Sequence, residues 1–220
     1  RAQTLPQGQG ELALPAAIKE ISVAVVADPL FVQANSSDPQ AAVVARMNVV
    51  DGIYSGQVGV QLKLSSVLPL NANGTLTSTA PSTLLGQFGN YTASGSFTNP
   101  GIAHLFTGRD LDGSTVGIAY LGSLCSSRFS VGVSQMVGVG TVSALIAAHE
   151  IGHNFGAPHD NQSGSACASS PSGFIMNPSV NASANTFSSC SLAQMAPTEP
   201  PTHRPTIRVP AAWPRHSGSR

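Results

Sequence analysis

One stretch of eleven residues constrains the fold of this chain more than any other part of the sequence. It reads H-E-x-x-H-x-x-G-x-x-H and runs from His149 to His159. On a helix, residues four apart lie on one face, so His149 and His153 would present their imidazoles side by side. Gly156 tolerates the left-handed conformation that ends helices, and Pro158 discourages any continuation. The pattern therefore predicts a helix, a reversal of the chain, and a third histidine that returns to the first two.

Three histidines that converge in this way fit a tetrahedral zinc site with three protein ligands and one open position. Glu150 lies about 100° round the helix from the first ligand, which places its carboxylate beside the open position, where it could act as a general base toward water. The alternative is a set of ordinary solvated or buried histidines on an amphipathic helix, but the pattern would arise here by chance with a probability on the order of 10⁻⁵. We therefore expect His149, His153 and His159 to bind the metal.

The composition indicates one domain with a polar rather than a charged surface. The chain has 220 residues, of which 41% are apolar and 9% are charged, with a net charge of zero. Nucleic acid and anionic membranes are not expected as partners, because both would need a basic patch. No apolar run approaches the roughly 18 residues of a membrane span. The chain begins at Arg1 without a leader, and we expect any signal peptide or pro-segment to have been removed.

The chain divides by composition into three segments. Residues 1–16 are rich in Gln, Gly and Pro and are expected to form a flexible lead-in, for which a remnant of a pro-segment is one interpretation. Residues 17–195 carry the periodic apolar patterns and make up the predicted domain. Residues 196–220 contain six prolines and four arginines, and truncation, a different reading frame and a disordered linker are all open as explanations.

The first part of the domain alternates strand and helix patterns. Ile18 to Ala27 is short, β-branched and almost continuously apolar, which is typical of a strand buried on both faces. Asp38-Pro39 combines a capping residue with a proline suited to the first helical position, and a helix of about four turns should follow. Val58 to Leu64 alternates apolar and polar residues, as in a strand with one exposed face. This order implies a crossover and parallel pairing.

The second part leads to the helix that carries the histidine motif. Residues 71–100 are expected to form loops around a short helix at 81–88. Three more short strands are expected, at 102–106, 115–121 and 129–139. Thr141 is the expected N-cap of the motif helix, whose apolar face continues into the first two ligands.

Two further features make the sequence resemble a known family. Met176, in Phe-Ile-Met-Asn-Pro, follows the last histidine of the motif by 17 residues, as in the Met-turn of the metzincin metalloproteases. The segments around residues 104–108, 117–120, 125 and 130–133 are similar to the adamalysin (reprolysin) branch. The resemblance covers roughly residues 18–195. It implies an α/β fold with a mixed five-stranded sheet, one antiparallel edge strand, an active-site helix and a small C-terminal subdomain after Gly156.

The resemblance also assigns roles within the motif. It implies zinc ligands at His149, His153 and His159, the catalytic glutamate at Glu150 and the Met-turn methionine at Met176. We expect Met176 to form an apolar floor that supports the ligands without touching zinc. For Asp160, which follows the third ligand, an exposed structural role and a supporting role beside the site are both open.

The three cysteines, Cys125, Cys167 and Cys190, contain no C-x-x-C pair, so a disulfide is expected rather than a zinc-thiolate site. The resemblance implies that Cys125 pairs with Cys190, which would close a loop of about 65 residues and contribute roughly 3–5 kcal/mol to stability. Cys167 is then left without a partner. A disulfide is consistent with a secreted, extracellular protein.

Calcium is doubtful as a second metal. Related enzymes hold it through acidic residues at places that here correspond to Ser22 and Gly101, and calcium requires oxygen ligands that are mostly carboxylates.

The resemblance implies a zinc-dependent endopeptidase. Its substrate would be an extended protein or peptide that adds to the strand at 115–121 by main-chain hydrogen bonds, with a side-chain pocket bounded by the segment after Met176. One alternative is a catalytically silent zinc-binding or adhesion module of the same fold, which would usually have lost a ligand or the glutamate. A zinc hydrolase for a non-peptide substrate is another. The sequence does not predict an oligomeric state.

Overall fold

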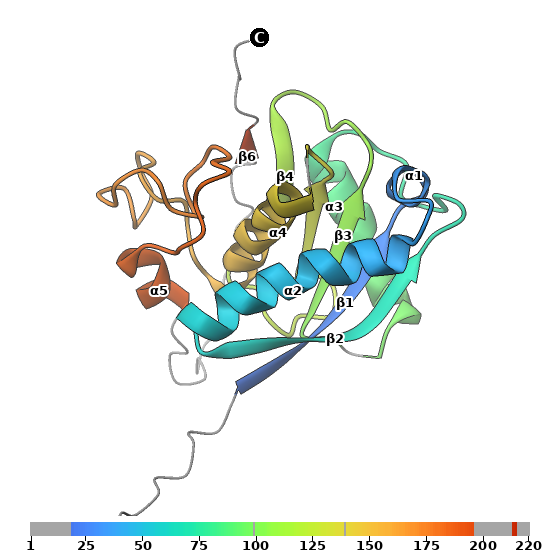
Figure 1. The fold of residues 1–220 in the computed structure, drawn as a ribbon, viewed down its shortest axis with the longest axis horizontal. Coiled ribbons are helices and arrows are strands. Elements are labelled where there is room, and N and C mark those ends of the chain that lie inside the picture. The colour runs from blue at the N-terminus through green and yellow to red at the C-terminus, as the bar shows by residue number, and fades with distance from the viewer. Residues whose placement is uncertain (1–18, 99, 139, 196–212, 215–220) are drawn as a thin grey trace, which may run out of the picture.

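The computed structural model describes residues 19–98, 100–138, 140–195 and 213–214, which form a mixed sheet with helices on both faces (Figure 1). The strands are β1 (Lys19–Ala27), β2 (Val60–Pro69), β3 (Ile102–Thr107), β4 (Thr115–Ala119), β5 (Val131–Gln135) and β6 (Trp213–Pro214). Their order in the sheet is β2-β1-β3-β5-β4-β6. Strands β2, β1, β3 and β5 are parallel, β4 is antiparallel to β5, and β6 is antiparallel to β4.

The predicted mixed sheet of five strands with one antiparallel member is confirmed in β1 to β5. A sixth strand, β6, is added outside β4, in a part of the chain for which the sequence predicted no regular structure. Apart from β6, the predictions for residues 1–16 and 196–220 lie outside the described residues.

The helices are α1 (Pro29–Ala34), α2 (Pro39–Gln57), α3 (Pro81–Tyr91), α4 (Gly140–Phe155) and α5 (Ser189–Met195), with one π-helical turn at Thr92–Ser96. The predicted cap of α2 is confirmed, because the Asp38 side chain accepts a hydrogen bond from the Ala41 amide at 2.8 Å. The same Asp-Pro pair occurs at Asp28 and starts α1, which the sequence analysis missed. Thr141 is not an N-cap, since α4 already includes Gly140.

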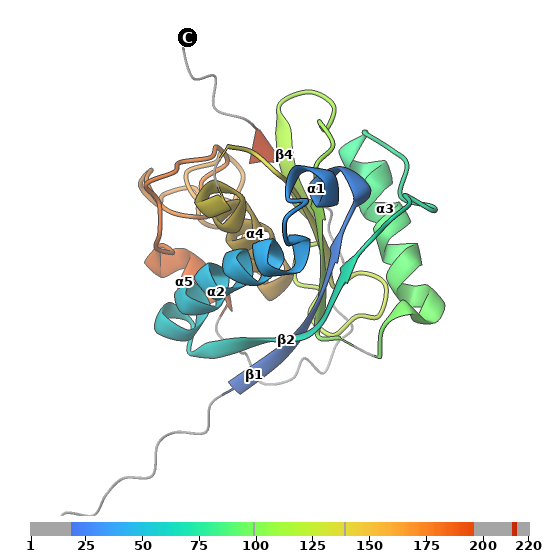
Figure 2. The same ribbon diagram turned by 45° about the vertical axis from the view of Figure 1, so that its right-hand side comes forward.

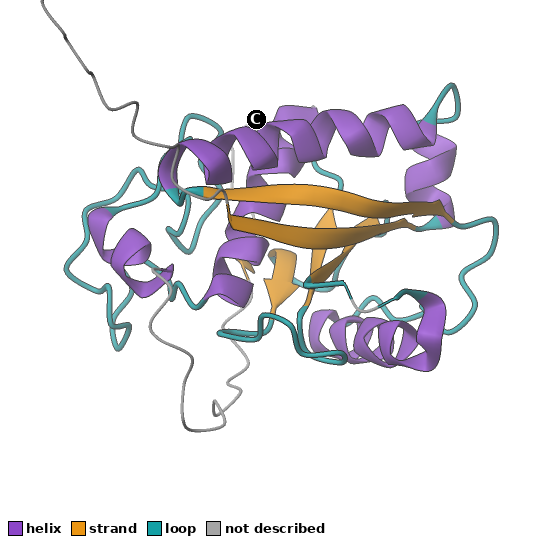
Figure 3. Ribbon diagram, turned by 90° about the horizontal axis from the view of Figure 1, so that it is seen from below, coloured by secondary structure: helices purple, strands orange, loops and turns teal. Residues whose placement is uncertain are grey.

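The core lies in two layers, one on each side of the sheet. Helices α2 and α4 cover one face and α3 covers the other (Figures 2 and 3). Alternate residues of β1 serve the two layers: Val23 and Val25 pack into the cluster with α2 and α4, whereas Val26 packs into the cluster with α3. Strand β1 is therefore buried on both faces over this stretch, as its apolar sequence predicts. None of the helices in the described part of the chain has the length and apolarity that a membrane crossing requires.

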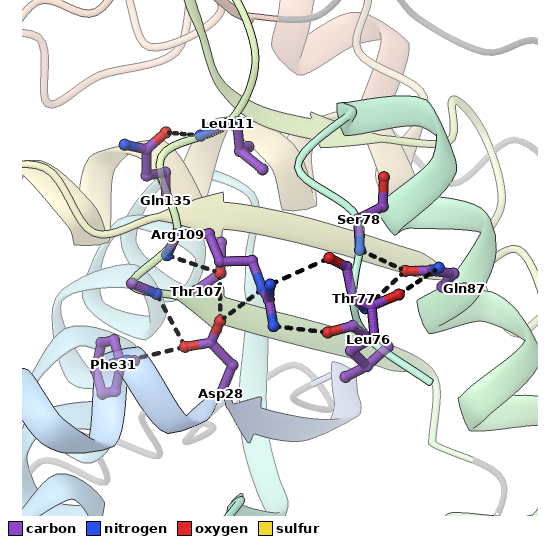
Figure 4. Close-up of polar contacts among 11 residues, drawn as sticks. Asp28, Phe31, Leu76, Thr77, Ser78, Gln87, Thr107, Arg109, Leu111 and Gln135 are labelled. Carbon is purple, nitrogen blue, oxygen red and sulfur yellow. Dashed lines mark hydrogen bonds and ion pairs between the residues drawn. The ribbon is translucent and has the colours of Figure 1, made fainter. Parts of the chain in front are cut away.

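A buried polar network joins the ends of β1 and β3 (Figure 4). Asp28 accepts hydrogen bonds from the Phe31 amide, the Gly108 amide and the Thr107 hydroxyl, and its carboxylate lies 3.4 Å from Arg109 Nε. The Arg109 guanidinium also donates to the carbonyl of Leu76 at 2.7 Å. One carboxylate thus starts α1 and ties the β3–β4 connection to the segment before α3.

The chain after Gly156 forms a small lower subdomain, which is built mainly of turns and ends in α5. A disulfide joins Cys167 to Cys190, with their Cα atoms 5.8 Å apart, and Cys125 is an exposed free thiol. The predicted pairing of Cys125 with Cys190 is therefore wrong. Cys125 lies in the β4–β5 connection, where its amide bonds to the Gly101 carbonyl, whereas the two bonded cysteines both lie in the lower subdomain.

Candidate metal centre

The first two histidines of the motif lie one turn apart on α4. Their rings are edge to face with centroids 4.6 Å apart, and both are buried. Gly156 has a φ of +105°, and its amide bonds to the His153 carbonyl, so the helix ends as the sequence predicted. The chain then turns back and brings His159 against the other two rings.

The three imidazoles converge through the same ring atom. His159 Nε2 lies 3.1 Å from His149 Nε2 and 3.1 Å from His153 Nε2. Three nitrogens bound to one tetrahedral zinc ion at about 2.0–2.1 Å would be separated by about 3.3 Å, so the observed spacing fits this metal. Among the described residues, these histidines are the only group of three or more potential ligands of this kind that gathers around a single point.

The other nitrogen of each ring has an oxygen partner. His149 Nδ1 lies 2.7 Å from the Ile175 carbonyl, and His153 Nδ1 lies 2.7 Å from the Ala157 carbonyl. His159 Nδ1 lies 2.6 Å from Gln162 Oε1. Because a carbonyl oxygen only accepts, each Nδ1 carries the proton and each Nε2 directs its lone pair to the common point. The protonation pattern is that of a metal site.

The electrostatic environment keeps the three rings neutral. Burial lowers the pKa of His153 to about 3, with a further contribution from neighbouring His159. Burial also lowers the pKa of His149 well below its usual range, with contributions from both other rings, and it lowers the pKa of His159. Neutral imidazoles near pH 7 are the form that a metal ion requires.

Glu150 is buried between α4 and β4. Neither of its carboxylate oxygens has a hydrogen-bond partner among the described residues, and burial raises the pKa of Glu150 well above its usual range. A Cβ atom built on Gly117 would overlap Glu150 Oε1, so the strand needs glycine at the point where it passes the carboxylate. An unpaired, buried carboxylate on the residue that directly follows the first histidine of the motif fits a group that needs a water or substrate partner.

Met176 is buried under the motif helix. A Cβ atom built on Gly152 would lie 2.6 Å from Met176 Sδ, so α4 and the methionine approach as closely as a glycine permits. The preceding carbonyl, of Ile175, orients His149. Met176 thus packs below the ligand-bearing turns of α4, where the sequence analysis expected an apolar floor.

Asp160 is fully buried, so the exposed structural role, one of the two roles that the sequence left open, is wrong. Its Oδ1 accepts hydrogen bonds from the Ser188 hydroxyl at 2.7 Å and the Ser191 hydroxyl at 3.1 Å. Its backbone amide donates to the Met176 carbonyl at 2.8 Å. Asp160 therefore ties the third-ligand loop both to the Met-turn and to the start of α5.

Several residues that support the site were missed in the sequence. Gln162 follows the third ligand by three residues, but a single glutamine in a polar loop carries no recognisable signal. Ile175 and Ala157 act through backbone carbonyls, which every residue has. Gly117 did have a signal, because an isolated glycine inside a strand pattern indicates a close approach.

A hollow of about 280 Å³ opens beside two of the ligands. Its walls are formed by Leu121, His153, Pro158, His159, Gln162, Ser163, Gly164 and Ser165. The two positions considered for calcium lie elsewhere, since Ser22 is in β1 and Gly101 directly precedes β3. The Gly101 amide donates to the Ser22 hydroxyl at 2.9 Å. The expectation that this chain lacks a calcium site stays a prediction.

Comparison with known proteins gives a family match over most of the domain. The family model Reprolysin_5, described as metallo-peptidase family M12, matches residues 17–188. Zinc metalloproteinase-disintegrin-like BmMP of Bungarus multicinctus is 44% identical over 93 residues, which are 42% of this chain and 15% of that protein. Zinc metalloproteinase recombinant fibrinogenase II of Deinagkistrodon acutus is 43% identical over 94 residues, which are 42% of this chain and 39% of that protein. The chain therefore spans well under half the length of these relatives.

A solved structure also shares the fold. One chain of a structure described as "Structure of a chaperone-substrate complex" superposes with a TM-score of 0.58 at 16% identity, over 78% of this chain and 29% of that chain. At this identity, the similarity concerns the fold alone.

Proposed function

Because the chain belongs to the Reprolysin_5 family of M12 metallopeptidases, we propose that it is a zinc-dependent endopeptidase that hydrolyses peptide bonds of extended polypeptides. The observation that carries this proposal is the convergence of three deprotonated Nε2 atoms, together with the buried, unpaired carboxylate of Glu150, the residue that directly follows His149. The ligands would be His149, His153 and His159.

The chemistry divides between the metal and the protein. Zinc, when bound, would lower the pKa of a coordinated water toward neutrality and polarise the scissile carbonyl. The three histidines hold fixed orientations through their Nδ1 partners, so the site does not need to reorganise during the reaction. Met176 keeps the turns of α4 that carry two of the ligands in place.

Glu150 is the proposed general base. Its raised pKa favours the uptake of a proton from the attacking water, and the same carboxyl group can then deliver that proton to the leaving amine. The substrate's own carbonyl carbon is attacked by water, so the reaction needs no serine or cysteine nucleophile.

The outer edge of β4 is the proposed binding strand for substrate. An extended peptide can add to this edge through main-chain hydrogen bonds, which tolerate many sequences. Gly117 in β4 lies directly against Glu150, so a peptide on this edge passes the general base. The segment after Met176 would bound a side-chain pocket.

We place the protein outside the reducing cytosol, in a secreted or extracellular setting. The disulfide between Cys167 and Cys190 supports this location, because such bonds persist in oxidising compartments.

Replacing Glu150 with Gln tests the proposal. The amide keeps the shape of the side chain but cannot take up the proton, so we expect zinc binding to persist and kcat on casein or a reporter peptide to fall by about 10²–10⁴-fold. Zinc content and peptide hydrolysis should be measured on the same samples, with and without a chelator. Equal turnover by the parent and the variant would remove Glu150 as the base. Loading with zinc but no hydrolysis by the parent would favour a silent zinc-binding module.

A further inference from the structure

Strand β6 occupies the outer edge of β4. Trp213 lies opposite Gly117, and Pro214 lies opposite Thr115, in antiparallel pairing. In the views of Figures 1 and 2, β6 lies beside β4 at the end of the sheet that is remote from β2. Without β6, β4 would be the last strand and would present its unpaired backbone groups.

This edge is the one that runs past the general base. Trp213 is in register with Gly117, whose Cα faces the Glu150 carboxylate so closely that no side chain would fit there. The backbone of β6 therefore lies at the sheet edge at the level of Glu150.

A strand edge accepts one partner at a time. The backbone groups of β4 that pair with β6 are the groups that would pair with an extended substrate. The antiparallel direction of β6 also shows that this edge accepts an extended segment of peptide. Any peptide that uses the same groups must first displace the segment around Trp213.

We propose that the C-terminal segment around Trp213 is a built-in competitor that docks on β4 and occupies the substrate's edge. This inference rests on the proposed function, since competition matters only if peptides bind there. Two features favour reversible docking. Strand β6 contains only two residues, and Pro214 has no amide hydrogen to donate. Tethering compensates for this weakness, because a linked segment has an effective concentration in the millimolar range.

Removing the pairing in the full chain tests the proposal. We would replace Trp213→Gly and Pro214→Gly together, with Pro201→Gly and Thr202→Gly as a matched pair of changes in the same C-terminal segment. We expect the first variant to show a KM for a reporter peptide that is lower by about threefold to tenfold with an unchanged kcat, and the second to match the parent. Adding the nonapeptide of residues 208–216 in trans should raise the KM of the first variant again, and a scrambled peptide should not.

Hydrogen exchange provides a readout that does not depend on catalysis. Amides of β4 that pair with β6 should exchange faster in the Trp213→Gly/Pro214→Gly variant, whereas amides between β4 and β5 should not change. A third measurement uses Trp213, the only tryptophan of the chain, whose fluorescence anisotropy should fall when a reporter peptide saturates the Glu150→Gln protein.

The outcomes separate this proposal from the proposed function. Equal KM values and equal β4 exchange in the parent and the Trp213→Gly/Pro214→Gly variant would overturn the docking, even if both cleave peptide. If no form cleaves any peptide but β4 exchange still rises in the variant, the docking of the segment stands and the protease assignment fails.

Discussion

The two proposed ligands on α4 and the third proposed ligand after Gly156 reach the same point by different means. His149 and His153 are carried by a helix that is buried against the sheet and α2, and backbone carbonyls orient both rings. His159 lies in a turn-rich subdomain, and the side chain of Gln162 orients its ring. The core of the domain thus positions two ligands, whereas local side chains position the third.

The support for the third ligand is correspondingly local. Asp160 binds two serines at the start of α5, and the disulfide between Cys167 and Cys190 closes a short loop in the same subdomain. This subdomain also contributes apolar side chains to the main core cluster, namely Ala157, Ile175, Met176, Phe187 and Met195. The comparison teaches that the candidate metal site couples the layer around α4 to a subdomain that adds local hydrogen bonds and one covalent link to its apolar contacts.

Loss of the disulfide should have the largest effect on stability among the changes that test the difference between α4 and the subdomain after Gly156. Replacing Cys167 and Cys190 with Ser together should lower the free energy of unfolding by about 3 kcal/mol, for a loop with a sequence separation of 23 residues. Urea denaturation measures the total effect, and hydrogen exchange should place the loss after Gly156. Cys125→Ser is the control and should be nearly neutral. A larger loss from Cys125→Ser than from the double change would reinstate the pairing that the sequence analysis predicted.

A smaller effect is expected at the side chain that orients His159. Gln162→Ala should weaken zinc binding by about 10–100-fold, the usual effect of removing the partner of a ligand's second nitrogen. Gln162→Glu keeps an oxygen acceptor and should bind zinc at least as tightly as the parent. Competition with a chromophoric chelator measures the affinity without reference to activity. Ser163→Ala, in the same loop, serves as the control, and an equal loss in this control would remove the special role of Gln162.

The last prediction concerns a histidine of the sheet that is not part of the motif, and its effect is small per pH unit. His104 in β3 is fully buried beside the Ser134 hydroxyl, and burial lowers its pKa to about 3 from a usual value of 6.5. Below pH 6.5 the unfolded chain binds a proton that the folded chain does not, so His104 makes the folded state less stable as the pH falls toward 3. In His104→Gln, the dependence of unfolding free energy on pH should weaken by about 1.4 kcal/mol per pH unit in this window.

Urea titrations of zinc-free protein between pH 4 and pH 6 would check the His104 prediction, with His203→Gln as the matched control. The three histidines of the metal site are common to all three proteins, so their contribution to the slope cancels in the comparison. An unchanged slope in His104→Gln would show that His104 takes up its proton in the folded state.

The centre of the site could be predicted from the sequence because it depends on local geometry. Helical spacing places His149 beside His153, and a glycine that adopts a positive φ lets the chain return. The buried first strand and the capped second helix were also predictable, since apolar runs and Asp-Pro pairs act over a few residues. The Met-turn came from family resemblance rather than from any such rule.

The remainder depends on contacts between distant parts of the chain. Cysteine pairing follows from which cysteines the fold brings together, and spacing alone cannot supply this. Position 125 was carried over from the resemblance and proved to lie outside the lower subdomain. The docking of β6 on β4 was equally beyond prediction, because two residues after a proline-rich stretch have no strand pattern.

The three histidine rings of the metal centre differ in whether a substitution can remove the group that orients them. A substitution at Ile175 or Ala157 alters a side chain but leaves in place the carbonyl that holds the ring. A substitution at Gln162 removes the holding group itself. The affinity for the metal could therefore change during evolution, or be adjusted in a mutant library, through substitutions at Gln162 alone. The other two rings would keep their backbone partners.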